Sequence, residues 1–228
     1  MDLKIDIPDS RLLTSKVADK IREFIILGKF KPGERLVEIK LAESLGISRQ
    51  PIREAFRILE LEHLITLIPR KGAYVSKISL KETKEIYETR AMIEGFAAQL
   101  AISHITQKDI SQLESILDLM EKSIKENNLK KVIQYNLYFH RKIVSLSKNG
   151  NLTKVYESML LPVRRYQKMG LSLQSSWVIS LEEHRSILEA LNSRDIKRAE
   201  EMCRNHVLKA EKRLIDCLIL SQKGGLQE

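Results

Sequence analysis

Three histidines in the second half of the chain are the residues best suited to bind a metal ion. His140, His184 and His206 fall on three separate predicted helices, and Asn136 lies one helical turn before His140, on the same face. Imidazole is the commonest side-chain ligand for zinc, nickel and related ions. Three imidazoles and one oxygen ligand would form a closed or half-open site inside a helical bundle. Spacing alone leaves the alternative open, namely three unrelated histidines.

A row of arginines in the first third of the chain suits a polyanion instead. The stretch LGISRQPIREAFRILE, 45–60, carries Arg49, Arg53 and Arg57 at intervals of four. At 3.6 residues per turn these side chains drift by about 40° per step. A different face of the same helix carries an apolar stripe, which consists of Ile52, Ala55, Phe56 and Leu59. The pattern predicts a helix that packs on one side and meets DNA on the other, although a solvated charged surface is the plain alternative.

The beginning of this helix carries the most specific signals. Ser48 is predicted to be the N-cap, with its hydroxyl accepting a free backbone N–H, and Pro51 then lies in the first turn. The N-terminal end of a recognition helix usually contacts base edges in the major groove of DNA. Arg49 suits the O6 and N7 atoms of guanine, and Gln50 suits adenine. Arg53, one turn further on, is placed for a phosphate or a base edge.

Short elements are expected around this helix. Residues 17–28 follow helical spacing, 31–36 form a turn, and 38–45 form a short helix closed by a glycine. Two short helices joined by a three-residue turn predict a helix-turn-helix. The segment LITLIPRKGAYVSKI, 64–78, predicts a β-hairpin with a basic tip, which is a wing.

The remainder of the chain is predicted to be all-helical, because glycine and proline become sparse from residue 80 until the tail. The expected helices span residues 80–103, 106–126, 129–147, 151–171, 179–192 and 194–221. The predicted fold class is therefore mainly α. A winged helix-turn-helix DNA-binding domain, 1–78, precedes an all-helical effector-binding and dimerisation domain of bundle type, 79–228.

Composition and charge narrow the class of protein. The net charge is +9, which favours a polyanionic partner, but +4 falls in residues 1–78 and +5 in the rest, so total charge does not locate the site. The apolar runs are too short to cross a bilayer, and the N-terminus has no secretory h-region. Cys203 and Cys217 lie fourteen residues apart in one predicted helix, about 21 Å, too far for a disulfide. We therefore expect free thiols, a cytoplasmic location and no membrane.

The DNA-binding half resembles a known family. PGERLVEIKLAESLGISRQPIREAFRILE is similar to the winged helix-turn-helix of the GntR family of bacterial transcriptional regulators, with the S-R-x-P-x-R-E-A core at 48–55 and the P-R-x-G-A-x-V wing at 69–75. The resemblance implies that Arg49 and Arg53 contact an operator and that Gly72 lets the wing tip enter the minor groove. The full set of predicted DNA-binding residues is Ser48, Arg49, Gln50, Arg53, Arg70, Lys71 and Gly72.

Three positions depart from the family pattern. Ile39 stands where family members with well-known operators often have arginine, and Gln50 stands where threonine is common. His63 ends the recognition helix at a position where glycine is usual. The operator sequence therefore does not carry over from the family.

The helical half, from about residue 80 to 222, is similar to the FCD effector domain of the FadR-like branch of that family. The matching segments are KEIYETRAMIEGFAAQLA at 84–101, NLYFHRKIVSLSKNGNL at 136–152, EEHRSILEAL at 182–191 and A-x3-C-x2-H at 199–206. In many members an Asp or Asn and three His in these helices bind a divalent metal. The resemblance implies a metal, zinc or nickel, bound by Asn136, His140, His184 and His206, with Asn136 replacing the commoner aspartate.

The resemblance also implies a function. It predicts a homodimeric regulator, with repression as the expected mode, whose affinity for a double-stranded DNA operator is controlled by a small carboxylate effector at the metal site. Arg90 is the expected effector-binding residue, and Arg164 and Arg165 are weaker candidates. The alternatives are a metal-responsive sensor and a metal-dependent enzyme. Against an enzyme, the sequence has no HExxH motif, and Glu183 beside His184 points about 100° away on the helix.

Overall fold

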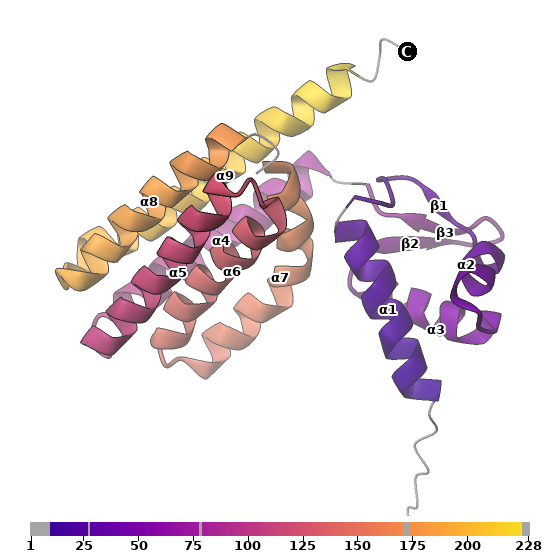
Figure 1. Ribbon diagram of the computed structural model, residues 1–228, viewed down its shortest axis with the longest axis horizontal. Coiled ribbons are helices and arrows are strands. Elements are labelled where there is room, and N and C mark those ends of the chain that lie inside the picture. The colour runs from indigo at the N-terminus through magenta and orange to yellow at the C-terminus, as the bar shows by residue number, and fades with distance from the viewer. Residues whose placement is uncertain (1–9, 27, 78, 171–173, 225–228) are drawn as a thin grey trace, which may run out of the picture. The chain divides into compact units, whose positions relative to one another are not determined.

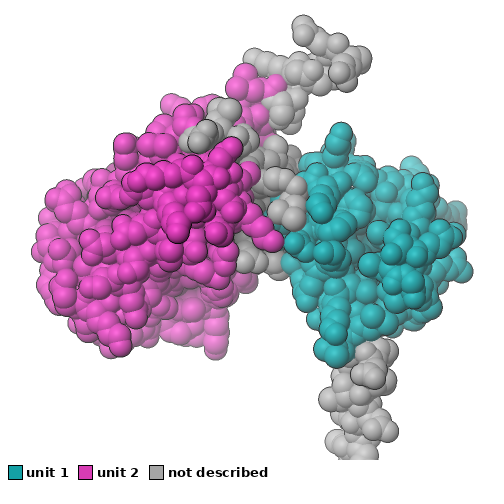
Figure 2. Space-filling view, viewed as in Figure 1, with its two compact units in different colours: residues 1–78 teal, residues 79–228 magenta. Residues whose placement is uncertain are grey.

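The computed structural model describes residues 10–26, 28–77, 79–170 and 174–224; for Ser10, Arg11, 161–170, Gln174 and 221–224 it describes the backbone only. Its described part contains nine helices and three short strands, which confirms the predicted mainly-α fold class (Figure 1). The chain divides into two compact units, 1–78 and 79–228 (Figure 2). No helix in the described ranges is long and apolar enough to span a membrane.

The first unit is a winged helix-turn-helix. Its elements are α1 (Ser10–Ile26), β1 (Arg35–Leu36), α2 (Glu38–Leu45), α3 (Arg49–Leu61), β2 (Ile65–Ile68) and β3 (Gly72–Val75). The three strands form an antiparallel sheet in the order β1-β3-β2, with Arg35 opposite Tyr74 and Ile68 opposite Gly72. The predicted hairpin is therefore present as β2 and β3.

The turn expected at 31–36 is wrong in its second half, because it contains β1. Burial of Leu36 and two backbone bonds hold this segment against β3: the amide of Gly33 donates to the carbonyl of Val75 at 2.8 Å, and the amide of Val75 donates to the carbonyl of Glu34 at 2.9 Å. A strand of two residues has no alternating pattern to detect, so only pairing with β3 defines it.

The apolar stripe of α3 packs as predicted. Ile52, Ala55, Phe56 and Leu59 are all at most 2% exposed. They share a core with α1, whose buried residues are Val17, Ala18, Ile21 and Ile25. Pro51 is buried in the first turn. His63, just past the helix, has φ +57, the left-handed conformation that explains why glycine is usual there.

The predicted cap of α3 is only half right. Ser48 occupies the N-cap with extended φ −72 and ψ 164, but its hydroxyl accepts no capping hydrogen bond. An N-cap side chain normally bonds the amide of the second or third helical residue. Here the third residue is Pro51, which has no amide hydrogen, so the preferred donor is missing.

The second unit is a helical bundle. Its elements are α4 (Leu80–Ala101), α5 (Gln107–Lys125), α6 (Leu129–Leu146), α7 (Gly150–Gly170), α8 (Gln174–Asn192) and α9 (Ile196–Gly224). The predicted break at Thr106 is a capping box, in which Thr106 and Asp109 satisfy each other's backbone amides. The predicted α8 began at residue 179, which is too late, because Trp177 packs into the bundle core and extends the helix backwards.

Close packing of α4 against α9 organises the bundle. A Cβ added at Gly95 of α4 would lie 3.3 Å from the backbone oxygen of Glu200 on α9, so the two helices approach closely there. The α4, α5, α6, α8 and α9 helices enclose a common apolar core that includes Ala98, Leu113, Phe139, Ile187 and Cys203. This core is the scaffold on which the histidines of three helices are fixed.

Truncating a core side chain of α5 tests this scaffold. Leu113 is 0% exposed, and Leu113→Ala is expected to lower the free energy of unfolding by about 2–5 kcal/mol through lost burial and a residual cavity. Leu119→Ala on the same helix, at a 44% exposed position, should change it by less than about 0.5 kcal/mol. Urea unfolding followed by the fluorescence of the single tryptophan, Trp177, measures both variants. Equal losses would contradict the assigned core.

Asp109 predicts a pH-dependent contribution to stability. Its carboxylate accepts a 2.7 Å hydrogen bond from Lys142 and a 2.6 Å bond from Thr106, and these lower its pKa to about 2. Because the folded pKa lies below the unfolded value, this stabilisation is present at neutral pH and is lost as the pH falls from about 4 towards 2. The unfolding free energies of wild type and Asp109→Asn should differ by about 1 kcal/mol at pH 7 and converge only below about pH 2. A constant difference would show that the ion pair contributes nothing.

Candidate DNA-binding face and three-histidine centre

The predicted DNA-reading residues of α3 are exposed and differ in their partners. Arg53 Nε donates to Glu38 Oε2 of α2 at 2.8 Å, and Gln50 Nε2 donates to Glu54 Oε1 at 3.0 Å. Arg49 is exposed and forms no ion pair within the described part of the chain. The guanidinium of Arg49 is therefore available for DNA. That of Arg53 would contact DNA only if it broke its bond to Glu38 or kept it while also contacting DNA.

The wing tip lies in the turn between β2 and β3. Arg70 has φ +63 and Gly72 has φ +101, and both residues are exposed together with Lys71. A Cβ on Gly72 would lie 3.8 Å from the guanidinium of Arg35, so β1 brings a third cation to this tip. Sequence reasoning missed Arg35 because its segment was expected to be a turn, not a strand beside the wing.

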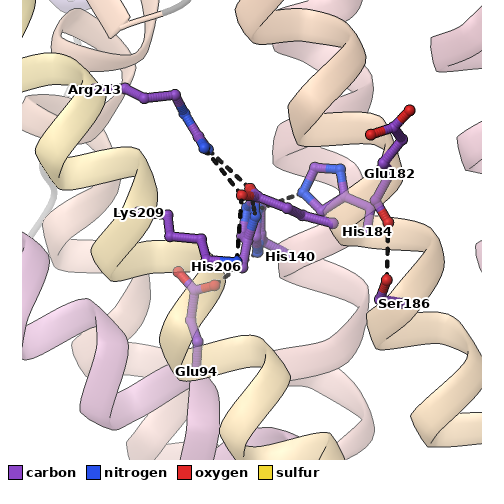
Figure 3. A network of polar contacts seen from close by, with 9 residues as sticks. Glu94, His140, Glu182, His184, Ser186, His206, Lys209 and Arg213 are labelled. Carbon is purple, nitrogen blue, oxygen red and sulfur yellow. Dashed lines mark hydrogen bonds and ion pairs between the residues drawn. The ribbon is translucent and has the colours of Figure 1, made fainter.

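The second unit brings the three predicted histidines together. His140 of α6, His184 of α8 and His206 of α9 are buried at 2%, 0% and 5% exposure (Figure 3). His140 Nε2 lies 3.1 Å from His184 Nε2 and 3.3 Å from His206 Nε2. Asn136 is also buried, at 5% exposure, one turn before His140 on α6. Among the described residues these three histidines form a cluster of metal-ligand type.

The outer nitrogens of two rings face carboxylates. His140 Nδ1 lies 2.7 Å from Glu94 Oε2 of α4, and His206 Nδ1 lies 2.7 Å from Glu183 Oε2 of α8. A carboxylate in this position keeps the proton on Nδ1 and leaves the lone pair of Nε2 directed at the centre. The Nδ1 of His184 has no such partner in the described region, and its ring packs against Phe139 with centroids 4.6 Å apart.

The spacing of the inner nitrogens fits a divalent ion. Ligand nitrogens at about 2.05 Å from zinc would lie about 3.3 Å apart at the tetrahedral angle and about 2.9 Å apart at a right angle. The two observed separations, 3.1 and 3.3 Å, fall in this interval. Converging lone pairs repel one another, and a cation between them would turn that repulsion into binding. The donor set therefore suits a metal.

Each of the two carboxylates is also held by an arginine. Arg90 Nε and Nη2 donate to Glu94 Oε1 at 2.9 and 2.7 Å. Arg213 Nη1 and Nη2 donate to Glu183 at 3.0 and 2.8 Å. Two Arg–Glu–His chains thus lead into the centre, one from α4 and one from α8 and α9.

Burial favours the neutral form of two of the imidazoles, those of His184 and His206. Burial works against the ionised form of Glu94, but Arg90 and then His140 hold the pKa of its carboxyl at about 2. Burial lowers the pKa of His206 to about 4, although its hydrogen bond to Glu183 opposes this shift. Burial, followed by the neighbouring His206 and His140, also lowers the pKa of His184 well below its ordinary value. Neutral imidazole is the form that binds metals.

The structure also tests the arginine and glutamate residues that the sequence analysis named or missed. Arg90, the expected effector-binding residue, is 3% exposed and lies in the ion pair with Glu94, over the ring of Tyr87. The side chains of Arg164 and Arg165 lie outside the described part. The sequence missed Glu94 and Arg213; the only available signal was the four-residue spacing of Arg90 and Glu94. Glu183 does turn away from His184, and it contacts His206 instead.

Two family models match the chain. The model for bacterial regulatory proteins of the gntR family matches residues 13–75, and the FCD domain model matches residues 85–209. YdhC of Bacillus subtilis, an uncharacterised HTH-type transcriptional regulator, is 32% identical over 91% of this chain and 90% of its own. A probable D-xylose utilization operon repressor of Paenarthrobacter nicotinovorans is 27% identical over 89% of this chain and 91% of its own.

Solved structures share the fold. Escherichia coli McbR/YncC aligns with a TM-score of 0.71 at 24% identity, covering 92% of this chain and 98% of that one. A GntR transcriptional regulator from Rhodococcus sp. RHA1 aligns with a TM-score of 0.76 at 23% identity, covering 89% and 97%. The metal-free FCD domain of TM0439 aligns with a TM-score of 0.55 at 22% identity, covering 64% and 99%.

Replacing Arg49 tests the predicted reading end of α3. Arg49→Ala is expected to weaken operator binding by about 5- to 150-fold, because one bidentate arginine–guanine contact contributes about 1–3 kcal/mol. Fluorescence anisotropy at one fixed salt concentration measures the change. Lys20→Ala, which removes a 52% exposed cation from α1, serves as the matched control and should leave affinity nearly unchanged. Intact operator binding by Arg49→Ala would show that the assignment of α3 is wrong.

Proposed function

Because the chain belongs to the GntR family of bacterial regulatory proteins and carries an FCD domain, we propose that a small carboxylate bound at a divalent metal controls its operator affinity. As a member of this family the chain is a DNA-binding transcriptional regulator and not an enzyme. The observation that carries the proposal is the close approach of three buried histidines, with Nε2 of His140 3.1 Å from that of His184 and 3.3 Å from that of His206. Two of the three rings are backed by carboxylates.

The metal would be held by the Nε2 atoms of His140, His184 and His206, with the side-chain oxygen of Asn136 as the fourth ligand. Zinc and nickel are the ions that suit three imidazoles. When bound, the ion supplies a Lewis-acid position that attracts a carboxylate. A similar solved structure is named for its metal-free state, which supports testing this type of domain for metal.

Charge balance supports an anionic effector. Glu94 and Glu183 are each paired with an arginine, so these four side chains sum to zero. Imidazole binds a metal in its neutral form and Asn136 carries no charge, so a divalent ion would add two uncompensated positive charges to a buried centre. Uncompensated buried charge is costly, so an anion with one or two carboxylates would be bound favourably.

Arg90 remains the proposed anchor for that anion. Its pair with Glu94 uses Nε and Nη2, and we propose that the remaining nitrogen, Nη1, turns to the carboxylate of the effector. Glu94 contacts both this guanidinium and Nδ1 of His140, so the proposed anchor and the proposed metal ligands belong to one network. Burial at 3% exposure would strengthen such a charge-assisted bond.

We further propose that the regulator acts as a homodimer and represses. Two helix-turn-helix units would meet half-sites about one helical turn apart on a near-palindromic operator. On α4, Met92 at 71% exposure and Phe96 at 47% share one face, which is an apolar surface for a second copy. The effector would have to bind one arrangement of the two DNA-binding units more tightly than another to change affinity.

A thermal-shift experiment tests the metal site. Zinc or nickel at about 100 times Kd should add about 2.7 kcal/mol to the stability of the folded wild type, and a carboxylate added afterwards should raise Tm further. His184→Ala should abolish both shifts, because it removes a metal ligand. It leaves neither Glu94 nor Glu183 without its histidine partner, since Nδ1 of His184 has no partner among the described residues. His104→Ala, at an exposed histidine, is the control and should respond like wild type.

Operator titration then separates the possible roles of the ion. If metal and a carboxylate are both needed to change operator affinity, the ion holds the effector, as proposed. If metal alone changes affinity, the protein is a metal sensor and the effector proposal is wrong. Equal metal shifts for wild type and His184→Ala would contradict the three-histidine site itself.

A further inference from the structure

The DNA-binding unit has a small surface hollow at the reading end of α3. Its volume is about 410 Å³, and its lining consists of Ile39, Ala42, Glu43, Gly46, Ile47 and Arg49. The first four belong to α2 and its closing glycine, and Arg49 is the first residue of α3. The hollow thus joins the two helices of the helix-turn-helix.

Ile39 is an apolar residue in this hollow whose exposure is not explained by packing within the fold. It is the second residue of α2 and is 51% exposed, although Leu41 and Ala42 beside it pack on the core. Single exposed apolar residues are common on protein surfaces and carry no meaning alone. Here the exposed side chain shares a hollow with Arg49, the residue placed to contact a base edge.

We propose that Ile39 contacts the C5 methyl group of a thymine in the operator, next to the base contacted by Arg49. Thymine is the only base that presents a methyl group in the major groove, and apolar side chains recognise it. Ile39, at 51% exposure, offers the apolar surface for that methyl. The contact at this position of the fold would therefore be apolar and specific for thymine.

The charges around the hollow favour a base over a phosphate. Glu43 lines the hollow and Glu38, the neighbour of Ile39, is the partner of Arg53 at 2.8 Å. The carboxylate of Glu43 would repel a phosphate approaching Ile39, whereas the charge of Glu38 is balanced by Arg53. A methyl group carries no charge and needs only the removal of water from both surfaces.

Continuity with the DNA-binding face identifies DNA as the occupant. The first residues of a recognition helix enter the major groove, so a base edge that meets Arg49 has its neighbours beside the same hollow. Ile39 lies on the first helix of the motif, but the shared lining places its side chain at the groove end of α3. The proposal therefore adds one specificity-determining residue to an interface that the family already defines.

Removal of single methyl groups from DNA tests the proposal. The probe is a duplex selected from a randomised pool by the full-length wild-type chain, with each half-site thymine replaced in turn by deoxyuridine. At one thymine position the wild type should lose about fourfold in affinity per half-site, the value expected for one buried methyl group. Ile39→Ala should bind the thymine and the uracil duplex equally well at that position.

Two controls keep the test specific. Ile39→Val retains a branched apolar side chain and should keep most of the thymine preference, and thermal unfolding should show that both exposed-site variants fold like wild type. A selected half-site with no thymine-sensitive position would overturn the proposal. So would an Ile39→Ala variant that keeps the full preference for thymine, or one that weakens all duplexes equally while that preference persists.

Discussion

The second unit depends on one constraint: the Nε2 atoms of three buried imidazoles are held close together, with that of His140 3.1 Å from His184 and 3.3 Å from His206. Rings that carry their protons on Nδ1 direct three lone pairs at the same place, and these repel one another unless something positive lies between them. The surrounding helices keep the rings there because each of two Nδ1 atoms faces a carboxylate, and each carboxylate is fixed by an arginine. The bundle therefore holds the three rings in an orientation that would suit a cation without further rearrangement.

That constraint links the metal proposal to the effector proposal. Because Arg90 and Arg213 already neutralise Glu94 and Glu183, the carboxylates orient the rings without lowering the charge of a bound ion. Asn136 in place of aspartate has the same effect. The centre would keep the full charge of a divalent metal for an incoming anion, which is the property that a receptor for small carboxylates requires.

The DNA-binding unit follows a different principle, in which shape is fixed by apolar packing and charge is left at the surface. The stripe of α3 buries itself against α1, and this leaves Arg49 exposed while Arg53 rests on Glu38. Pro51 removes the amide that Ser48 would have capped, so Ser48 keeps the N-cap backbone without the cap bond. The β1 strand adds Arg35 to the wing tip. The Ser48–Pro51 effect is local, but the other details depend on contacts between segments that are separate in the sequence.

Periodicity and composition were sufficient to predict the mainly-α class, the helix-turn-helix with its wing, and the buried stripe Ile52, Ala55, Phe56 and Leu59, because these are properties of local spacing. Motif resemblance pointed to the three histidines as one set. Only the tertiary structure revealed that Glu94, Glu183 and Arg213 complete the centre, since helix spacing does not say which residue of another helix will face an imidazole. The early start of α8, the strand β1 and the hollow at Ile39 were likewise decided by packing. Local sequence determines which face of each helix is apolar, whereas the close crossing of helices determines which polar side chains meet.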